Sequence, residues 1–222
     1  MKKQLSLTII MIMLILSACS PNEDPKTSKT ADAMIQPADL SKYEETLLKA
    51  GGAKKNLAFD YNVKGTDIQY IHIWMDVYKN GKKQKRFIDI ESLIRETENG
   101  HLLLTIQPAQ QQVDDFQYQK WVTTLVSNNG YSHSTTLRKA NSSSGMSASM
   151  ELSNETKIEP GQPITLAVKL ENPDAQSFSL SRTQFETEQD IAQKAKKYKR
   201  VSVLRCRFTK NEQLDKGSHQ KS

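Results

Sequence analysis

The sequence predicts a mainly β protein, an antiparallel β-sandwich with short flanking helices near its N-terminal and C-terminal ends. From Asn56 onward, apolar and polar residues alternate with the period of two that is typical of strands. Turn residues separate about eight such segments, and almost no long helical pattern lies between them. The same observations also fit an antiparallel barrel.

The clearest predicted strand is Ile68–Lys79. Asn80-Gly81 follows it, a strong signal for a type I′ hairpin turn, and the chain returns through Lys85–Ile90. The remaining predicted strands are Leu57–Val63, Leu102–Gln107, Phe116–Ser127, Tyr131–Leu137, Ser147–Leu152, Pro163–Glu171, Ser177–Ser181 and Val201–Phe208.

One stretch adds a resemblance to this pattern. Ile158–Glu171 places the turn Glu159-Pro160-Gly161-Gln162 before an alternating segment. It resembles a strand pair of immunoglobulin-like bacterial surface domains. This generic resemblance implies an immunoglobulin-like sandwich.

Two short helices are predicted, one on each side of the strand region. The first is capped by Asp39, ends at Gly51-Gly52 and has helical spacing of Leu40, Tyr43, Leu47 and Leu48. We expect it to pack on the main domain as a lid or flank. The second spans Phe185–Lys199, with Ile191 and Ala195 on one side.

The N-terminal segment carries the strongest functional signal. Lys2 and Lys3 precede an apolar run, Leu5–Ala18, which is shorter than the roughly 20 residues that span a bilayer. The run ends in Leu16-Ser17-Ala18-Cys19. This segment resembles the signal peptide and lipobox of bacterial lipoproteins. The resemblance implies that Cys19 receives a diacylglyceryl thioether and anchors the chain at the extracytoplasmic face of the cell membrane.

The domain organisation follows from this resemblance and from composition. Residues 1–18 are the expected signal peptide, and residues 19–38 are the lipidated cysteine and a disordered tether, polar and interrupted by prolines. Residues 39–208 form a single β-rich extracytoplasmic domain. The polar residues 209–222 form a disordered tail.

The charge balance is mildly basic. The whole chain has a net charge of +6, and removal of Lys2 and Lys3 leaves 29 basic against 25 acidic side chains. This excess is too small to predict a nucleic-acid partner. The basic stretches Lys54-Lys55, Lys82–Arg86 and Lys194–Arg200 are interpreted as solvated faces, with contacts to anionic head groups or wall polymers as the alternative.

The sequence predicts neither an enzyme nor a metal or cofactor site. Cys206 is the only cysteine besides Cys19, so no disulfide is expected, and it is interpreted as a small half-buried residue with a free thiol as the alternative. The histidines lack metal-ligand spacing and neighbouring carboxylates: His72, His101, His133 and His219. Alternation sends Ser132 and Ser134 away from His133, and Asp114-Asp115 is an isolated acidic pair.

One constellation in Ile68–Lys79 is the candidate ligand-binding site. Alternation places Ile71, Ile73, Met75 and Val77 on a core face. The opposite face carries the predicted site residues Tyr70, His72, Trp74, Asp76 and Tyr78. An exposed aromatic row of this kind would stack sugar rings or contact a protein. The alternative is that the row pairs across strands or lies beneath one of the helices.

These observations favour a non-catalytic binding module displayed at the cell surface. Its expected partners are the membrane, through the lipid on Cys19, and an envelope glycan or a protein. A second hypothesis is a protective or immunity-type lipoprotein that sequesters cationic peptides, although the basic surplus opposes it. A cell-envelope enzyme is the third.

Overall fold

The computed structural model describes residues 32–94, 99–113, 116–127, 130–139, 146–172, 177–178 and 180–211. The chain divides into two compact units, Met1–Thr30 and Ala31–Ser222, and all described residues belong to the second. Cys19 with its lipobox, Asp114-Asp115, His219 and the 212–222 part of the predicted tail lie outside the described residues.

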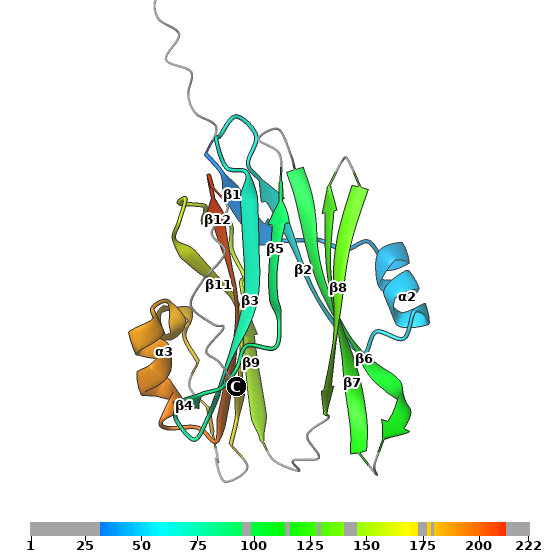
Figure 1. The fold of residues 1–222 in the computed structure, drawn as a ribbon, viewed down its shortest axis with the longest axis vertical. Coiled ribbons are helices and arrows are strands. Elements are labelled where there is room, and N and C mark those ends of the chain that lie inside the picture. Colours follow the sequence, from blue (N-terminus) through cyan, green and yellow to red (C-terminus); the bar gives the residue numbers. More distant parts are fainter. Residues whose placement is uncertain are drawn as a thin grey trace, which may run out of the picture. The chain divides into compact units, whose positions relative to one another are not determined.

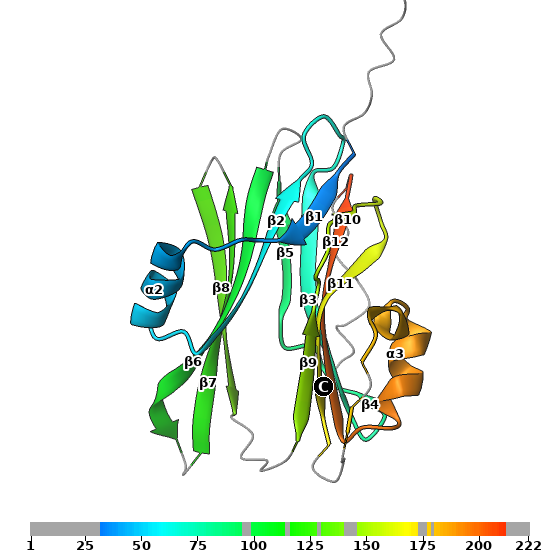
Figure 2. The same ribbon diagram turned by 180° about the vertical axis from the view of Figure 1, so that it is seen from behind.

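The second unit is built from two antiparallel sheets (Figures 1 and 2). Sheet A has the strand order β10 (Thr156–Lys157), β1 (Met34–Pro37), β2 (Lys55–Asn62), β6 (Asn99–Val113), β7 (Phe116–Ser127), β8 (Gly130–Lys139). Sheet B has the order β4 (Lys82–Lys83), β3 (Tyr70–Lys79), β12 (Arg200–Thr209), β11 (Pro163–Glu171), β9 (Ser147–Glu151), and β5 (Asp89–Leu93) also pairs with β3.

The two sheets share one hydrophobic core, which confirms the predicted antiparallel sandwich. Sheet A contributes Ile35, Leu57, Phe59, Tyr61, Leu102, Leu104, Trp121 and Leu125, and sheet B contributes Ile71, Ile73, Met75, Val77, Ile164, Leu166, Leu204, Cys206 and Phe208. The predicted core face of β3 is therefore correct. Cys206 is fully buried as a small apolar residue, and burial raises the pKa of its thiol.

The turn after β3 has the predicted type I′ geometry. Asn80 and Gly81 have φ angles of 49° and 76°, and a type I′ turn needs positive φ at both central residues. The predicted return strand Lys85–Ile90 is wrong over most of its length. The chain pairs with β3 directly after the turn, at the two-residue β4, and again at β5, which contains only Asp89 and Ile90 of the predicted strand.

One predicted strand is absent at its described residues, and two observed strands, β1 and β10, were not predicted. The predicted tether gives way to β1 at Met34, where Ile35 is completely buried and pairs with Tyr61 of β2. The predicted strand Ser177–Ser181 has no strand conformation at its described residues. The short strand β10 was not predicted, because two residues carry no readable alternation.

The two helices differ in how they relate to the sheets. Helix α2 (Lys42–Ala50) is capped by Ser41 rather than Asp39, through a capping box with Glu44. It buries no residue, and Tyr43 is 71% exposed, so the expectation that it packs as a lid is wrong. The predicted helix Phe185–Lys199 is shorter in the structure: α3 spans Glu188–Ala195, and Phe185 ends the preceding 3₁₀ turn η1 (Arg182–Phe185). Ile191 and Ala195 of α3 are buried, as predicted.

Candidate functional site

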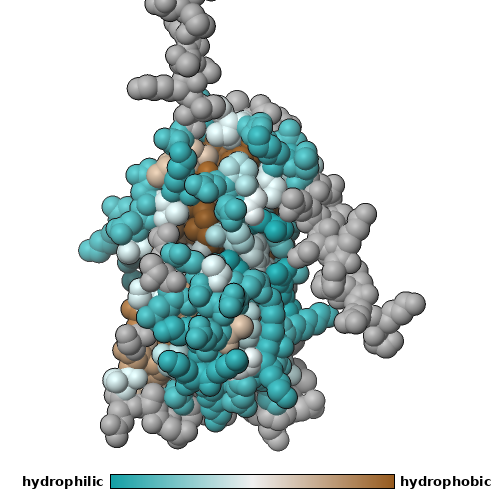
Figure 3. Space-filling model, turned by 90° about the vertical axis from the view of Figure 1, so that its left-hand side faces the viewer, coloured by the Kyte–Doolittle hydropathy of each residue, from teal (hydrophilic) through white to brown (hydrophobic). Residues whose placement is uncertain are grey.

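The aromatic row of β3 is buried, so of the two interpretations that the sequence left open, the exposed ligand-binding surface does not apply. Trp74 and Tyr78 are each 3% exposed, Asp76 is fully buried and His72 nearly so, while Tyr70 is half-buried. The five residues do share one face of the strand, as alternation predicts. The surface on this side of the molecule is mainly hydrophilic (Figure 3).

A third layer covers this row. Ile191 and Ala195 of α3 pack in one cluster with Tyr78. The guanidinium groups of Arg86, Arg205 and Arg207 lie 5.1, 5.6 and 5.8 Å from the centre of the Trp74 ring, within the range of cation–π contacts. The alternative interpretation, that the row is covered, is therefore the correct one: α3 covers Tyr78 and arginine side chains cover Trp74.

Asp76 is the centre of a polar network beneath this cover. Its carboxylate accepts hydrogen bonds from Trp74 Nε1 at 2.9 Å and from Arg86 Nε at 3.1 Å, and Lys83 Nζ lies 3.2 Å away. Lys83 also contacts Glu188 of α3 at 2.9 Å. Burial raises the pKa of Tyr78 in the same region. The network therefore ties β3 and β4 to α3.

Two histidines have carboxylate neighbours that the sequence did not reveal. His72 Nε2 lies 2.6 Å from Asp89 Oδ1, and His101 Nδ1 lies 2.6 Å from Asp60 Oδ1. Each pair joins residues of adjacent strands. In the part of the chain that the structure describes, however, no group of three or more His, Cys, Asp or Glu residues could hold a metal ion.

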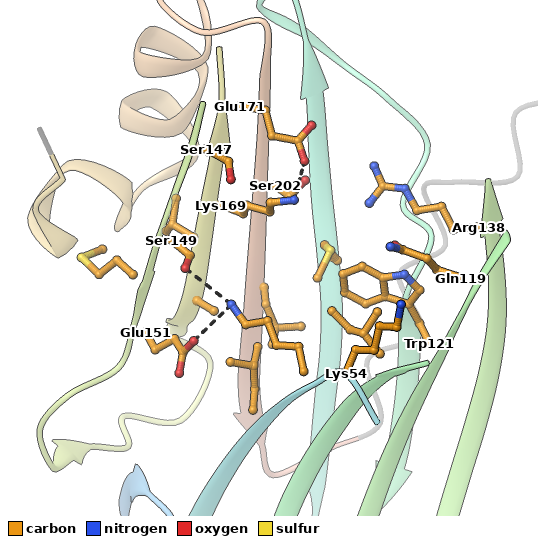
Figure 4. Close-up of a pocket in the computed structure, with 18 of the residues that line it drawn as sticks. Lys54, Gln119, Trp121, Arg138, Ser147, Ser149, Glu151, Lys169, Glu171 and Ser202 are labelled. Carbon is orange, nitrogen blue, oxygen red and sulfur yellow. Dashed lines mark hydrogen bonds and ion pairs between the residues drawn. The ribbon is translucent and has the colours of Figure 1, made fainter. Parts of the chain in front are cut away.

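A cavity of about 320 Å³ lies between the inner faces of the two sheets. Its apolar surface comes from Leu57, Met75, Ile106, Trp121, Met146, Met150, Ala167, Val168 and Leu204. Its polar surface comes from Lys54, Lys55, Gln119, Arg138, Lys139, Ser147, Ser149, Glu151, Lys169, Glu171, Asn172 and Ser202. Figure 4 shows the labelled polar groups on both walls.

The cavity lies where the inner faces of the strands change from apolar to polar. In β12, the inward residues Phe208, Cys206 and Leu204 belong to the core, and the next one, Ser202, lines the cavity. In β2, the series Tyr61, Phe59, Leu57 ends in Lys55. In β7, Leu125 and Trp121 are followed by Gln119. The polar inward positions therefore gather at one end of the sandwich.

A β-bulge in β11 helps to create this polar end. The pairing register with β12 shifts between Thr165 and Ala167, so Leu166 and Ala167 both contact the inner core. Beyond the shift, Val168 and Leu170 pack in the cluster with α3, while Lys169 and Glu171 line the cavity. Because of the bulge, the charged side chains Lys169 and Glu171 of β11 point into the space between the sheets.

The wall on sheet A carries cations without carboxylate partners. Arg138 of β8 lies over the rings of Phe87 and Trp121, at 5.0 and 5.9 Å. Burial lowers the pKa of its guanidinium, and the charge of Glu171 partly offsets this. Among the described residues, neither Arg138 nor the exposed Lys54 ion-pairs with a carboxylate. Trp121 is 8% exposed, and its buried Nε1 has no hydrogen-bond partner.

The wall on sheet B carries carboxylates that already have cationic partners. Glu171 lies 2.7 Å from Lys169, and Arg200 is 3.9 Å away. Glu151 lies 3.3 Å from Lys55, which reaches across from β2 in sheet A and also contacts Ser149 (Figure 4). With five basic side chains and two carboxylates, the cavity is electropositive, and most strongly so on sheet A.

Of the polar residues of this cavity, only the basic pair Lys54-Lys55 stands out in the sequence, where it is interpreted as a solvated face and not as part of a site. The remaining lining residues lie on strands whose inward side depends on the bulge and on sheet packing. A helix long and apolar enough to cross a membrane is not found in the described ranges.

Comparison with known proteins gives one match. No curated protein and no solved structure matches the chain. A family model, the YgaN domain, matches residues 34–208, which is more than three quarters of the 222 residues. This match begins at the first residue of β1 and ends inside β12, so it spans both sheets. The chain belongs to the YgaN domain family.

Proposed function

We propose that this protein is a lipid-anchored extracytoplasmic binding module that holds a small ligand in the cavity between its two sheets. The observation that carries the proposal is the polar lining of that cavity, on strand faces that are otherwise apolar and packed. Ligand sites are typically concave and mostly apolar, with a few placed polar groups.

The polar lining is costly for the fold unless it serves another purpose. Inward positions of a sandwich normally carry apolar residues that fill the space between the sheets. Here Lys169, Glu171 and Arg138 replace such residues, and about 320 Å³ stays open. Local departures from the packing pattern of this kind concentrate at functional sites.

The lipobox supports the cellular setting of the proposal. The N-terminal apolar run ends in Leu16-Ser17-Ala18-Cys19, and lipid on Cys19 would anchor the protein to the membrane. The folded unit would then meet ligands of the cell envelope. The partner classes proposed are therefore the membrane, through the anchor, and a small envelope molecule in the cavity.

A non-catalytic role fits the carboxylates of the cavity. Glu151 and Glu171 each form an ion pair with a lysine of the cavity, so both carboxylates already have a partner. A role in sequestering cationic peptides is opposed by the excess of basic side chains in the cavity.

Native mass spectrometry of the protein purified gently from membranes tests the binding role. We expect a small-molecule adduct on the natural chain and its loss in Ser149→Trp, which fills the cavity from β9. Ser153→Trp is the matched control, because Ser153 is exposed and does not line the cavity. An adduct that persists in Ser149→Trp would contradict binding at this site.

Cell fractionation tests the anchor. We expect the natural chain in the membrane fraction and Cys19→Ser in the soluble fraction. Cys206→Ala, which changes the other cysteine, should stay in the membrane fraction. Equal membrane recovery of Cys19→Ser and the natural chain would exclude lipid anchoring through Cys19.

A further inference from the structure

We infer that the cavity between the sheets binds an amphipathic anion, a short alkyl or acyl chain ending in a phosphate or carboxylate, with its anionic end against the sheet A wall. The inference rests on the proposed function, because it names the ligand class of the same cavity. It follows from the different charge states of the two walls.

The first step is the lack of an ion pair at Arg138 among the described residues, where the charge of Glu171 offsets burial only in part. Arg138 is half-buried, its guanidinium lies over the rings of Phe87 and Trp121, and no described carboxylate ion-pairs with it. Removing a charge from water is costly unless an opposite charge or hydrogen bonds compensate it. Cation–π contacts compensate only part of this cost. A bound anion would complete the compensation.

Other donors of the same wall surround this cation. Gln119 is the cross-strand neighbour of Arg138, and Trp121 follows two residues along β7. The buried Trp121 Nε1 is a donor without a partner, and the Lys54 ammonium makes no ion pair among the described residues. Figure 4 shows the four side chains on one wall. Together they offer charged and neutral donors to the oxygens of one anionic group.

The opposite wall does not compete for the anion. Lys169 of that wall is ion-paired with Glu171, and Lys55, which reaches across from sheet A, is ion-paired with Glu151, so their charges are already compensated. The two carboxylates would also repel an anion placed beside them. An anionic group is therefore directed toward Arg138 and Lys54.

The rest of the cavity suits an apolar chain. Leu57, Ile106 and Leu204 present aliphatic surface between the walls. Met75, Met146 and Met150 add flexible thioether side chains, which adapt to the shape of a linear chain. The ligand is thus amphipathic: inorganic phosphate would leave this surface uncovered, and an alcohol would leave Arg138 without a counter-charge.

Titration calorimetry with four probes tests the inference: octyl phosphate, octanoate, octan-1-ol and inorganic phosphate, all below their aggregation concentrations. We expect octyl phosphate or octanoate to bind at least tenfold more tightly than octan-1-ol and than inorganic phosphate. The ratio between octyl phosphate and octanoate distinguishes a phosphate end from a carboxylate end.

Charge variants locate the anionic end. Arg138→Gln and Lys54→Gln should each weaken octyl phosphate binding, Arg138→Gln by about tenfold or more, and leave octan-1-ol binding unchanged. Arg138→Lys keeps the charge and should retain part of the affinity. Lys169→Gln is the matched control, since it removes a charge from the same cavity at an already paired position. If Arg138→Gln does not fold, the exposed Lys54 carries the test.

Three results would overturn the inference, and they can be told apart. If octyl phosphate and octan-1-ol bound equally tightly and Ser149→Trp abolished both, the cavity would bind a ligand but would not select an anionic end group. An effect of Lys169→Gln equal to that of Arg138→Gln would place the anion elsewhere. If no probe binds and the natural chain carries no co-purified adduct, the proposed function fails together with the inference.

Discussion

At the scale of single residues, Asp76 holds together the polar network on the outer side of sheet B. Its buried carboxylate accepts hydrogen bonds from Trp74 Nε1 and Arg86 Nε and forms an ion pair with Lys83 Nζ. Asp76→Asn keeps the shape but removes the charge that compensates two cations. We expect a loss of about 3 kcal/mol in the free energy of unfolding, measured by urea denaturation.

The control for this variant is Asp67→Asn. Asp67 pairs with Lys210, and both side chains are largely exposed, so water can replace the lost contact. We expect almost no change in the urea midpoint. Equal midpoints for Asp76→Asn and Asp67→Asn would show that the buried network does not stabilise the fold.

Cys206 gives a second prediction at this scale. Burial raises the pKa of the folded thiol above its value of 9.0 in the unfolded chain, so the unfolded state loses the proton first as the pH rises. The contribution to stability is complete below pH 9 and declines above it. We expect Cys206 to resist alkylation by iodoacetamide at pH 8 and to react in urea, as read by peptide mass spectrometry. Fast alkylation of the folded chain would contradict its burial.

Alternation predicted the two faces of β3 correctly but not their surroundings. It placed Tyr70, Trp74 and Tyr78 on one side because side chains point alternately along any strand. Whether that side meets water depends on residues far away in sequence, here Arg205 and the α3 residues. No local pattern contains this information, so alternation leaves open whether the aromatic row is exposed or covered.

At the scale of elements, the two α-helices allow a matched comparison. Both begin at a hydroxyl N-cap, Ser41 for α2 and Thr187 for α3. Only α3 buries side chains against a sheet. Thr187→Ala should therefore lower the free energy of unfolding of the whole domain by about 1 kcal/mol, measured by urea denaturation.

Ser41→Ala is the counterpart of that variant. It removes a similar cap from a helix that covers nothing, so α2 should fray while the global urea midpoint stays the same. Hydrogen exchange should show faster exchange of the α2 amides alone. A global loss of stability in Ser41→Ala would mean that α2 supports the sandwich.

Most strands were predictable because their alternation is local. β7 and β11 were predicted to the residue, and the Asn80-Gly81 turn has the predicted geometry. β1 was missed because its four residues follow a proline-containing polar stretch, and only pairing with β2 and β10 forms it. The bulge of β11 was also invisible, because strict alternation assigns Lys169 and Glu171 to the outside.

At the scale of the whole molecule, the sandwich was predictable and the candidate site was not. About eight alternating segments need two layers to bury their apolar sides, whatever their order in the sheets. The cavity arises from the way inner faces of strands from both sheets turn polar at the same end. That coincidence depends on strand order and register, which the sequence alone does not display.

Filling the cavity should therefore separate stability from binding. Ala167 lies in β11 at the bulge and lines the cavity. Ala167→Ile adds apolar volume to open space and a residue type that favours strands, so we expect about 1 kcal/mol more stability by urea denaturation. The same variant should lose octyl phosphate binding in calorimetry.

Ala58→Ile is the matched control for this last variant. Ala58 lies in β2 beside the inward residues Leu57 and Phe59, but it does not line the cavity. Ala58→Ile should keep octyl phosphate binding intact. If Ala167→Ile gained stability and still bound octyl phosphate like the natural chain, the open space would be a packing defect and the ligand site would lie elsewhere. A gain in stability with a loss of binding would show that the fold leaves this end unfilled for a ligand.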